Sequence, residues 1–407
     1  MKYNLKWLPF LVLFGCKNQE KDKQEAPVPV VQTASVQSIP SAELDHYKKL
    51  VEDFYQNAFG RGRFNGSFLV AKNGQVIFEE YAGFRDPRRK VDSITPNTAF
   101  HLASVSKTFT AMAVLKLWEE GRINIDHPVA EYLPGFPLKD VTVKCLLNHR
   151  SGIPNYVHYM EQLGWDRQKF ITNQDVFDFI VQRHKEIQIG APDRRFSYSN
   201  TNYALLALMV EKVTGQHFAE FMRLTFFDPL KMNDTYVFTP SDSARSLSSY
   251  FYSGREYAFD YLDLVYGDKN VYSTVRDLLK WDQALRGGML FRPETLEAAY
   301  TGYSNEKKGI NNYGLGWRLQ QYPNNKKIIY HNGWWHGNRT AFYRLPDENT
   351  TIIALCNNDS KMVYKSKQLA QLFGNYDAKG EDDEVDHRVM VESNSTPTAS
   401  RYGSSSN

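Results

Sequence analysis

The sequence is poor in cysteine and lacks the patterns that mark a metal-binding protein. Its three cysteines are Cys16, Cys145 and Cys356, which cannot form the C-x-x-C pairs typical of zinc sites. The ten histidines are scattered, and the metalloprotease pattern H-E-x-x-H is absent. We therefore expect no metal and no other cofactor. We interpret Cys145 and Cys356 as buried free thiols, with a disulfide between them as the alternative.

The chain also lacks an excess of charge of either sign. It has 49 Lys+Arg against 46 Asp+Glu, a formal net charge of +3, and no basic stripe with interleaved aromatic residues. This balance argues against a nucleic-acid partner. At 407 residues, with 42% hydrophobic and 23% charged residues, the composition is that of a globular protein with one large or two ordinary domains.

A membrane-spanning apolar run is missing as well, but residues 1–16 have the features of an export signal. Lys2 and Lys6 precede a short apolar run from Trp7 to Phe14, which is too short to cross a bilayer. The run ends Leu13-Phe14-Gly15-Cys16, which resembles the lipobox of bacterial lipoproteins, although Phe14 replaces the usual small residue. We expect a lipid on Cys16 and an exported envelope lipoprotein on the periplasmic side or the cell surface. A plain secretory signal is the alternative.

The segments on either side of the folded part have compositions that cannot build a core. Residues 17–40 are polar and then rich in Pro, Val, Gln and Ser, which predicts a flexible tether. Residues 377–407 combine an acidic run with a Ser/Thr-rich end, which predicts a disordered tail. The folded domain should therefore span about 41–376.

Apolar periodicity predicts strands at both ends of this domain and helices between them. A helix is expected from Ser41, a hairpin over 67–81 with its turn at Asn73-Gly74, and a helix without a polar face over 106–120. Further helices are expected over 173–183, 202–214, 273–285 and 362–373, and strands over 314–320, 327–331, 340–345 and 351–356. The pattern predicts an α/β (α+β) fold: an antiparallel sheet from about 41–121 and 286–376, flanked by helices, with an all-helical insertion over about 122–285.

The residues with the clearest chemistry are Ser104 and Lys107, at the start of the apolar helix. A serine hydroxyl needs a base to become a nucleophile. A lysine three positions on lies one helical turn away on the same face, and burial can lower its pKa enough for it to accept the proton. The pattern S-x-x-K is weak alone, because Ser304 to Lys307 also matches it in a polar loop. The buried helix behind Ser104 favours the first copy.

Two later motifs complete a candidate acyl-transfer site. Tyr198-Ser199-Asn200 offers a phenol that can relay a proton and an amide that can hold both Lys107 and a substrate. His331-Asn332-Gly333 ends a predicted edge strand, and its glycine lets a substrate lie close to the backbone. An N–H at this strand, together with that of Ser104, could stabilise an oxyanion.

These motifs together resemble the family of class C serine β-lactamases, penicillin-binding DD-peptidases and their esterase relatives. That family carries S-x-x-K, Y-x-N and then K-T-G or H-x-G in this order. The stretches Leu146–Pro154, Tyr272-Ser273-Thr274 and Tyr313–Trp317 also match it. The resemblance covers about 45–375.

The resemblance implies a role for each motif residue. Ser104 would be the acylated nucleophile, Lys107 its base, Tyr198 the proton relay and Asn200 a positioning group. The strand from His331 through Asn332 to Gly333 would bind the substrate, with the backbone N–H groups of Ser104 and Trp334 as the oxyanion hole. Whether lysine or tyrosine takes the first proton stays open. The implied fold is a β-lactamase/transpeptidase-like sheet with a helical domain beside it.

His331 stands where dedicated β-lactamases usually have a lysine, which favours an esterase or a D-amino-acid peptidase acting on a small ester or peptide. A DD-carboxypeptidase or β-lactamase is the alternative, and a non-catalytic ligand-binding relative is a third. Trp334, Trp335, Tyr156 and Tyr159 either shape an aromatic acyl pocket or simply pack. The physiological substrate, the oligomeric state and the membrane involved have no readable signal.

Overall fold

The computed structural model describes residues 36–60, 64–288 and 290–377. The expected signal peptide with Cys16, most of the expected tether and the tail beyond Asp377 lie outside the described residues. Across the described part, every helix is too short or too polar to cross a lipid bilayer.

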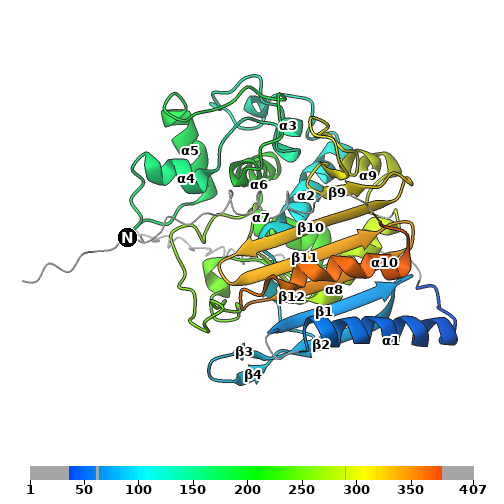
Figure 1. Cartoon of the computed structure of the whole chain (residues 1–407). Coiled ribbons are helices and arrows are strands. Elements are labelled where there is room, and N and C mark those ends of the chain that lie inside the picture. Colours follow the sequence, from blue (N-terminus) through cyan, green and yellow to red (C-terminus); the bar gives the residue numbers. More distant parts are fainter. Residues whose placement is uncertain (1–35, 61–63, 289, 378–407) are drawn as a thin grey trace, which may run out of the picture.

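Seven strands form one antiparallel sheet, which brings the two ends of the folded part together (Figure 1). The strand order is β2-β1-β12-β11-β10-β9-β8. The bounds are β1 (Gly66–Lys72), β2 (Gln75–Ala82), β8 (Asn311–Tyr313), β9 (Arg318–Gln321), β10 (Lys327–Trp335), β11 (Asn338–Leu345) and β12 (Thr350–Cys356). The expected antiparallel sheet with contributions from both ends is confirmed.

The hairpin at the N-terminal side forms where its turn residues predict it. Asn73 and Gly74 have φ values of 53° and 76°, the left-handed conformations that a tight two-residue hairpin turn needs. β1 then pairs with β12 on its other edge, with Phe68 opposite Ala354. Within the described residues, the first strand therefore lies next to the last.

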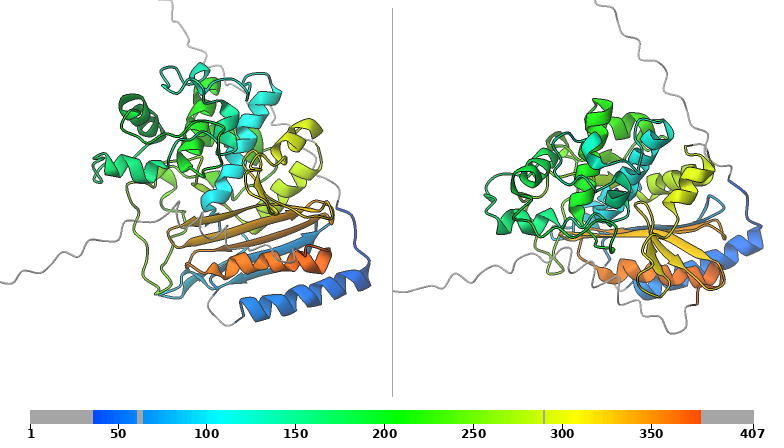
Figure 2. Two further views of the ribbon diagram at one scale, coloured as in Figure 1. Left: turned by 45° about the horizontal axis from the view of Figure 1, so that its top comes forward. Right: turned by 90° about the horizontal axis from the view of Figure 1, so that it is seen from above.

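Helices cover both faces of the sheet (Figure 2). α1 (Ser41–Ala58), the 3-10 helix η5 (Lys361–Leu369) and α10 (Ala370–Phe373) lie on one face, and the remaining larger helices lie on the other (Figure 1). Side chains alternate along β1: Phe68 and Val70 join the core beneath α1, while Leu69 and Ala71 join the larger core on the opposite side. This period of two is what a strand buried on both faces requires.

The helical layer holds α2 (Ser106–Glu119), which packs against α6 (Asn200–Thr214). Most side chains of α2 are buried, as a helix without a polar face demands. The other α-helices are α3 (Val143–Leu147), α4 (Tyr156–Gln162), α5 (Asn173–Arg183), α7 (Phe218–Met222), α8 (Val275–Arg286) and α9 (Pro293–Ala299). Short helical turns are η1 (Ala103–Val105), η2 (Val129–Glu131), η3 (Arg223–Phe227) and η4 (Pro240–Asp242).

Short strands also occur outside the main sheet. β3 (Phe84–Asp86) pairs with β4 (Val91–Ser93), and the order β5-β7-β6 forms a second small sheet from β5 (Phe100–His101), β7 (Val271–Ser273) and β6 (Tyr236–Val237). β6 and β7 belong to the stretch 122–285 that the sequence pattern treats as helical. They are only two and three residues long, which is too short for a periodic signal.

Three other boundaries differ from the expectation. The strand expected over 314–320 begins only at Arg318, as β9, because residues 314–317 form the turn from β8, where Gly316 has φ of 86°. The helix expected over 362–373 is mostly 3-10. β10 continues four residues beyond His331 because its pairing with β11 extends to Trp335 opposite Asn338.

Cys145 and Cys356 are both buried and free, so the interpretation as free thiols is confirmed. Burial raises the pKa of the Cys356 thiol to about 11. A thiol with a raised pKa is a poor nucleophile, so Cys356 is a structural residue.

Candidate active site

Ser104 lies in the turn that joins β5 to the buried helix α2. Ala103, directly before it, has φ of +49°, a conformation that non-glycine residues rarely adopt outside functional turns. Hydrogen bonds hold this turn: the Ala103 N–H donates to Nδ1 of His101 at 3.0 Å, and Nε2 of His101 lies 2.9 Å from Oδ1 of Asn270. Burial lowers the pKa of His101 to about 4. The ring is therefore neutral, with one nitrogen accepting and the other donating.

Lys107 is fully buried and its amine lies 3.1 Å from the hydroxyl oxygen of Ser104. The same Nζ donates to Oδ1 of Asn200 and to the backbone carbonyl of Asp268, both at 2.8 Å. A neutral amine has two N–H groups and one lone pair. Because the two acceptors occupy both N–H groups, the lone pair is left for the proton of Ser104.

The charge state of Lys107 follows from its surroundings. Burial is the largest influence and lowers the pKa of the amine to about 7; the charge of Asp268 opposes this effect, and that of Arg318 adds to it. An amine with a pKa near 7 is both partly free and adequately basic at neutral pH, which is the condition for a general base.

The Y-x-N motif approaches Lys107 from α6. Asn200 is the first residue of this helix, and the amine of Lys107 lies 4.9 Å from the ring centre of Tyr198. His149 holds the segment in place, because its ring packs 4.4 Å from that of Tyr198 and its Nδ1 accepts the N–H of Ser199. Burial is the main cause of the lowered pKa of His149, so this ring is also neutral.

His331 lies within β10, not at its end as the sequence suggested, and its side chain is buried. Its Nδ1 donates to the carbonyl of Asn332 at 2.7 Å, and its Nε2 lies 3.2 Å from the hydroxyl of Tyr313. Burial comes first among the causes that lower the pKa of His331 well below its ordinary value, followed by the charges of Arg318 and Lys107. The ring is an uncharged hydrogen-bonding group at neutral pH.

Gly333 lets β10 pack directly on the turn that carries Ser104. A Cβ at this position would lie 2.1 Å from Oγ1 of Thr340 and 2.4 Å from the carbonyl oxygen of Leu102. Thr340 itself donates to that carbonyl at 2.7 Å. The glycine therefore sets the distance between the strand and the nucleophile.

The two edges of β10 are paired with neighbouring strands over different lengths. β9 pairs only with the part from Lys327 to Tyr330, and within the described chain no strand pairs with this edge from His331 to Trp335. Beside His331 and Gly333, β10 therefore has β11 as its only strand neighbour in the described chain.

Sequence reasoning missed three charged residues at the site. Arg318 on β9 is buried, and its guanidinium lies 5.3 Å from the ring centre of Tyr198. Asp268 and Lys269 are buried beside Lys107. All three lie outside the motifs, and only their approach in the folded chain reveals them.

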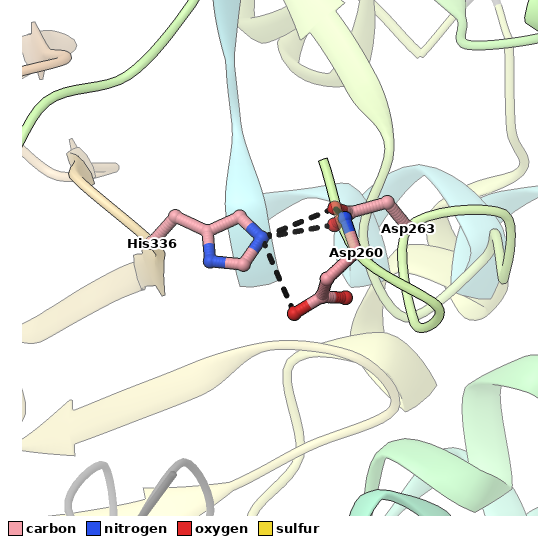
Figure 3. A group of neighbouring side chains, drawn as sticks. All are labelled: Asp260, Asp263 and His336. Carbon is pink, nitrogen blue, oxygen red and sulfur yellow. Dashed lines mark hydrogen bonds and ion pairs between the residues drawn. The ribbon is translucent and has the colours of Figure 1, made fainter. Parts of the chain in front are cut away.

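The end of β10 is anchored by an ion-pair cluster (Figure 3). Nε2 of His336 lies 3.1 and 3.2 Å from the two carboxylate oxygens of Asp263 and 4.0 Å from Oδ2 of Asp260. Trp335 Nε1 also donates to Asp263 at 2.6 Å. Burial opposes the charged ring, but Asp263 outweighs this effect, so the pKa of His336 is raised. The three side chains could each offer a metal one ligand atom, yet His336 and Asp263 already satisfy each other.

A cavity of about 360 Å³ adjoins this strand end and is lined by His101, Asp263, Trp335 and His336, among others. A larger one of about 490 Å³ is lined by none of the motif residues. Tyr156 and Tyr159, considered for an aromatic acyl pocket, are both buried. The hydroxyl of Tyr156 instead hydrogen-bonds with Asp268 and Lys269.

The second copy of S-x-x-K is placed differently. Ser304 and Lys307 lie in the loop between α9 and β8, and the Ser304 N–H donates to Asn312. No buried helix follows this serine, as the sequence suggested.

Known proteins have sequences that align with most of this chain. A profile described as Beta-lactamase matches residues 47–373. Penicillin-binding protein 4* of Bacillus subtilis (strain 168) is 31% identical over 337 residues, covering 78% of this chain and 73% of that protein. Teichoic acid D-alanine hydrolase of Staphylococcus aureus (strain NCTC 8325 / PS 47) is 27% identical over 344 residues, covering 82% and 80%.

Solved structures resemble the fold. An octameric penicillin-binding protein homologue from Pyrococcus abyssi has a TM-score of 0.68 at 24% identity, covering 79% of this chain and 76% of that one. D-amino acid amidase from Ochrobactrum anthropi SV3 has a TM-score of 0.63 at 22% identity, covering 81% and 96%. These two structures agree with the architecture described above. The profile match and the Bacillus subtilis relative show that the chain belongs to the beta-lactamase family and is a serine hydrolase.

Proposed function

We propose that this hydrolase works through an acyl-enzyme on Ser104, with Lys107 as the base that accepts the hydroxyl proton. The observation that carries the proposal is the arrangement of the amine: two hydrogen bonds to Asn200 and Asp268 fix it, and its remaining position faces Ser104 at 3.1 Å. A pKa of about 7 supports the free amine at neutral pH.

The reaction then has two halves. Ser104 Oγ bonds to the substrate carbonyl carbon as Lys107 takes the proton, and the N–H groups of Ser104 and Trp334 stabilise the oxyanion. Tyr198 relays a proton to the leaving group, which departs as an alcohol or amine. Water then attacks the acyl-serine by the same route in reverse, which releases the acid and restores the hydroxyl.

We propose esters and small amides or peptides of D-amino acids as substrates. The names of a teichoic acid D-alanine hydrolase and a D-amino acid amidase among the similar proteins support this class. The cavity beside Trp335 offers room for a substrate side chain. We also propose that the protein acts at the cell envelope, held by a lipid on Cys16.

The nucleophile is tested with nitrophenyl acetate and intact mass spectrometry. The wild type should hydrolyse the ester and carry a transient acetyl group, and Ser104→Ala should lose at least 1,000-fold in kcat, within the range that removal of a catalytic nucleophile costs. Ser304→Ala is the matched control because it alters the other S-x-x-K copy, and it should keep full activity. Retained turnover in Ser104→Ala would refute the proposal.

A DD-carboxypeptidase is the second candidate, and Arg318 favours it. Its buried guanidinium lies beside Tyr198, where a fixed cation can bind a substrate carboxylate, a role that the neutral ring of His331 cannot take. A peptide ending in a free D-alanine should then be cleaved faster than its amide-capped form. Arg318→Met should abolish that preference, and equal rates for both peptides in the wild type would exclude this candidate.

The lipid anchor has its own test. Full-length protein made in a bacterial host should partition into detergent, and Cys16→Ala should shift it to the aqueous phase. A Cys16→Ala variant that stays fully with the detergent would contradict the anchor and leave a plain secretory signal as the explanation.

A further inference from the structure

The side chains of Asp268, Lys269 and Tyr156 form a buried polar cluster that takes no part in the acyl-transfer steps. Lys269 Nζ donates to the hydroxyl of Tyr156 at 2.6 Å and lies 3.5 Å from Oδ2 of Asp268. The Tyr156 hydroxyl donates to the same Oδ2 at 3.2 Å. All three residues are at most 2% exposed. Burying an ion pair has a large desolvation cost, so a buried pair is weak evidence for stability. A contribution to stability alone therefore does not explain why this cluster is present.

The backbone of this cluster is fixed against the catalytic lysine. The carbonyl of Asp268 accepts a hydrogen bond from Lys107 Nζ at 2.8 Å. One residue earlier, the carbonyl of Gly267 accepts from Thr110 on the next turn of α2, also at 2.8 Å. Gly267 has φ of 92°, and a Cβ there would lie 2.5 Å from the carbonyl oxygen of Tyr203 on α6. The segment is therefore wedged between α2 and α6.

The side chain of Asp268 acts on Lys107 through its charge. Burial lowers the pKa of Lys107, Arg318 adds to this, and the carboxylate of Asp268 works in the opposite direction. Other titratable or polar groups also contact or act on the amine. They come from η1, the segment after α3, α6 and the residues before it, β10 and the residue after Asp268, and they are Ser104, His149, Tyr198, Asn200, Tyr203, His331 and Lys269. His149 and His331 are neutral, and Lys269 is the cation paired with Asp268, so Asp268 is the anion whose charge opposes the effect of Arg318 on Lys107.

We propose that Asp268 is a positioning residue for Lys107, held in place by Lys269 and Tyr156. Its carbonyl orients one N–H of the amine, so that the lone pair faces Ser104. Its carboxylate sets the pH range in which the amine is both free and sufficiently basic. The inference rests on the proposed role of Lys107 as the base.

Asp268→Asn tests the charge while keeping the carbonyl and the size of the side chain. Loss of the carboxylate should lower the pKa of Lys107 and move the acid limb of kcat/KM to lower pH by about one unit, the usual effect of one nearby charge. The ratio of kcat/KM at pH 6 to that at pH 8.5 should rise about fivefold for that shift. Asp282→Asn is the matched control, since Asp282 is an equally buried, ion-paired carboxylate that is not among the groups acting on Lys107.

The outcomes separate this inference from the proposed function. A folded Asp268→Asn variant whose kcat falls equally at every pH, with the acid limb unmoved, would reduce Asp268 to a structural residue and overturn the inference. Asp268→Ser, which also keeps the carbonyl and is smaller, serves if the asparagine variant does not fold. Failure of the proposed function would show instead as full activity in Ser104→Ala.

Discussion

At the scale of single residues, the proposed mechanism depends on one amine that burial leaves partly uncharged at neutral pH. Lys107 is fully buried, with two acceptors for its N–H groups and Ser104 next to its remaining position. Desolvation disfavours the ammonium form, so burial leaves the amine of Lys107 able to accept a proton, as its proposed role as the base requires. The S-x-x-K pattern alone does not produce this arrangement. Ser304 and Lys307 also match the pattern, but they lie in a loop with no buried helix after the serine.

The first prediction concerns the pH dependence of turnover. The free amine of Lys107 is the active form, and its pKa is about 7. The kcat/KM for nitrophenyl acetate should therefore fall as the pH drops through about 7 and reach a plateau above it. A profile from pH 5 to pH 9 gives the answer, and a rate that stays constant down to pH 5 would contradict Lys107 as the base.

A second prediction concerns Arg318, whose charge lowers the pKa of Lys107. Arg318→Met removes that charge, so the pKa of Lys107 should rise and the acid limb should move to higher pH by up to about one unit. The direction is opposite to that expected for Asp268→Asn. Arg276→Met, at an exposed arginine paired with Glu79, is the control and should leave the limb where it is.

The motif residues of the site could be predicted from the sequence, and its electrostatics could not. Ser104 and Lys107 are one helical turn apart, so local geometry predicts their contact. Asn200 lies 93 positions from Lys107, and its contact followed from the family resemblance. Arg318, Asp268 and Lys269 carry no motif and reach the site only through strand order and loop packing. The charge state of His331 depends on the burial of its ring. A strand pattern in the sequence does not give the burial of an individual residue.

At the scale of elements, the candidate site is built where β10 packs on the turn before α2. β10 continues through Gly333 to Trp335 although glycine weakens strands, because β11 pairs with it along that whole length. Helices and strands with strong periodicity, such as α1 and α5, were predicted to their observed starts. The short strands β6 and β7 were not, because two or three residues carry no period.

The third prediction tests the close approach of β10 to the nucleophile turn. Gly333→Ala places a Cβ against Thr340 and Leu102, so the strand or the turn must shift. We expect a loss of about 1–3 kcal/mol in the free energy of unfolding, typical of overpacking, and a 100-fold or larger fall in kcat/KM from the displaced site.

Gly190→Ala is the matched control for this substitution. The nearest atom to a Cβ at Gly190 is 3.7 Å away, an ordinary contact, so stability and activity should change little. Urea unfolding and ester hydrolysis measure both effects. Wild-type activity in Gly333→Ala would contradict the close packing of β10 on the turn.

At the scale of the whole molecule, one sheet with helices on both faces joins the two ends of the folded part. Asp282 on α8 links the helical layer to the sheet: Arg344 and Thr351 donate to it from β11 and β12, and Arg286 does so from its own helix. Burial would raise the pKa of Asp282, but the two arginines outweigh this effect and lower it.

The fourth prediction follows from this link. Asp282→Asn leaves buried arginine charge without its partner, which should cost about 3 kcal/mol in the free energy of unfolding. Because the pKa of Asp282 is lowered in the folded state, its contribution is present above the ordinary aspartate pKa of about 3.9 and is lost as the pH falls below it. Urea unfolding at pH 7 and pH 3 should show a difference between variant and wild type that shrinks at pH 3. The same difference at both values would contradict this account of Asp282.

The central claim is that Ser104 is the residue that becomes acylated. The most direct measurement is to mix the wild-type protein with nitrophenyl acetate, quench in acid within the first turnovers, digest and locate the acetyl group by tandem mass spectrometry. The account predicts one acetyl group per chain, on Ser104, that disappears after the ester is consumed. An acetyl group on another residue that forms and decays at the turnover rate, with Ser104 unmodified, would contradict it.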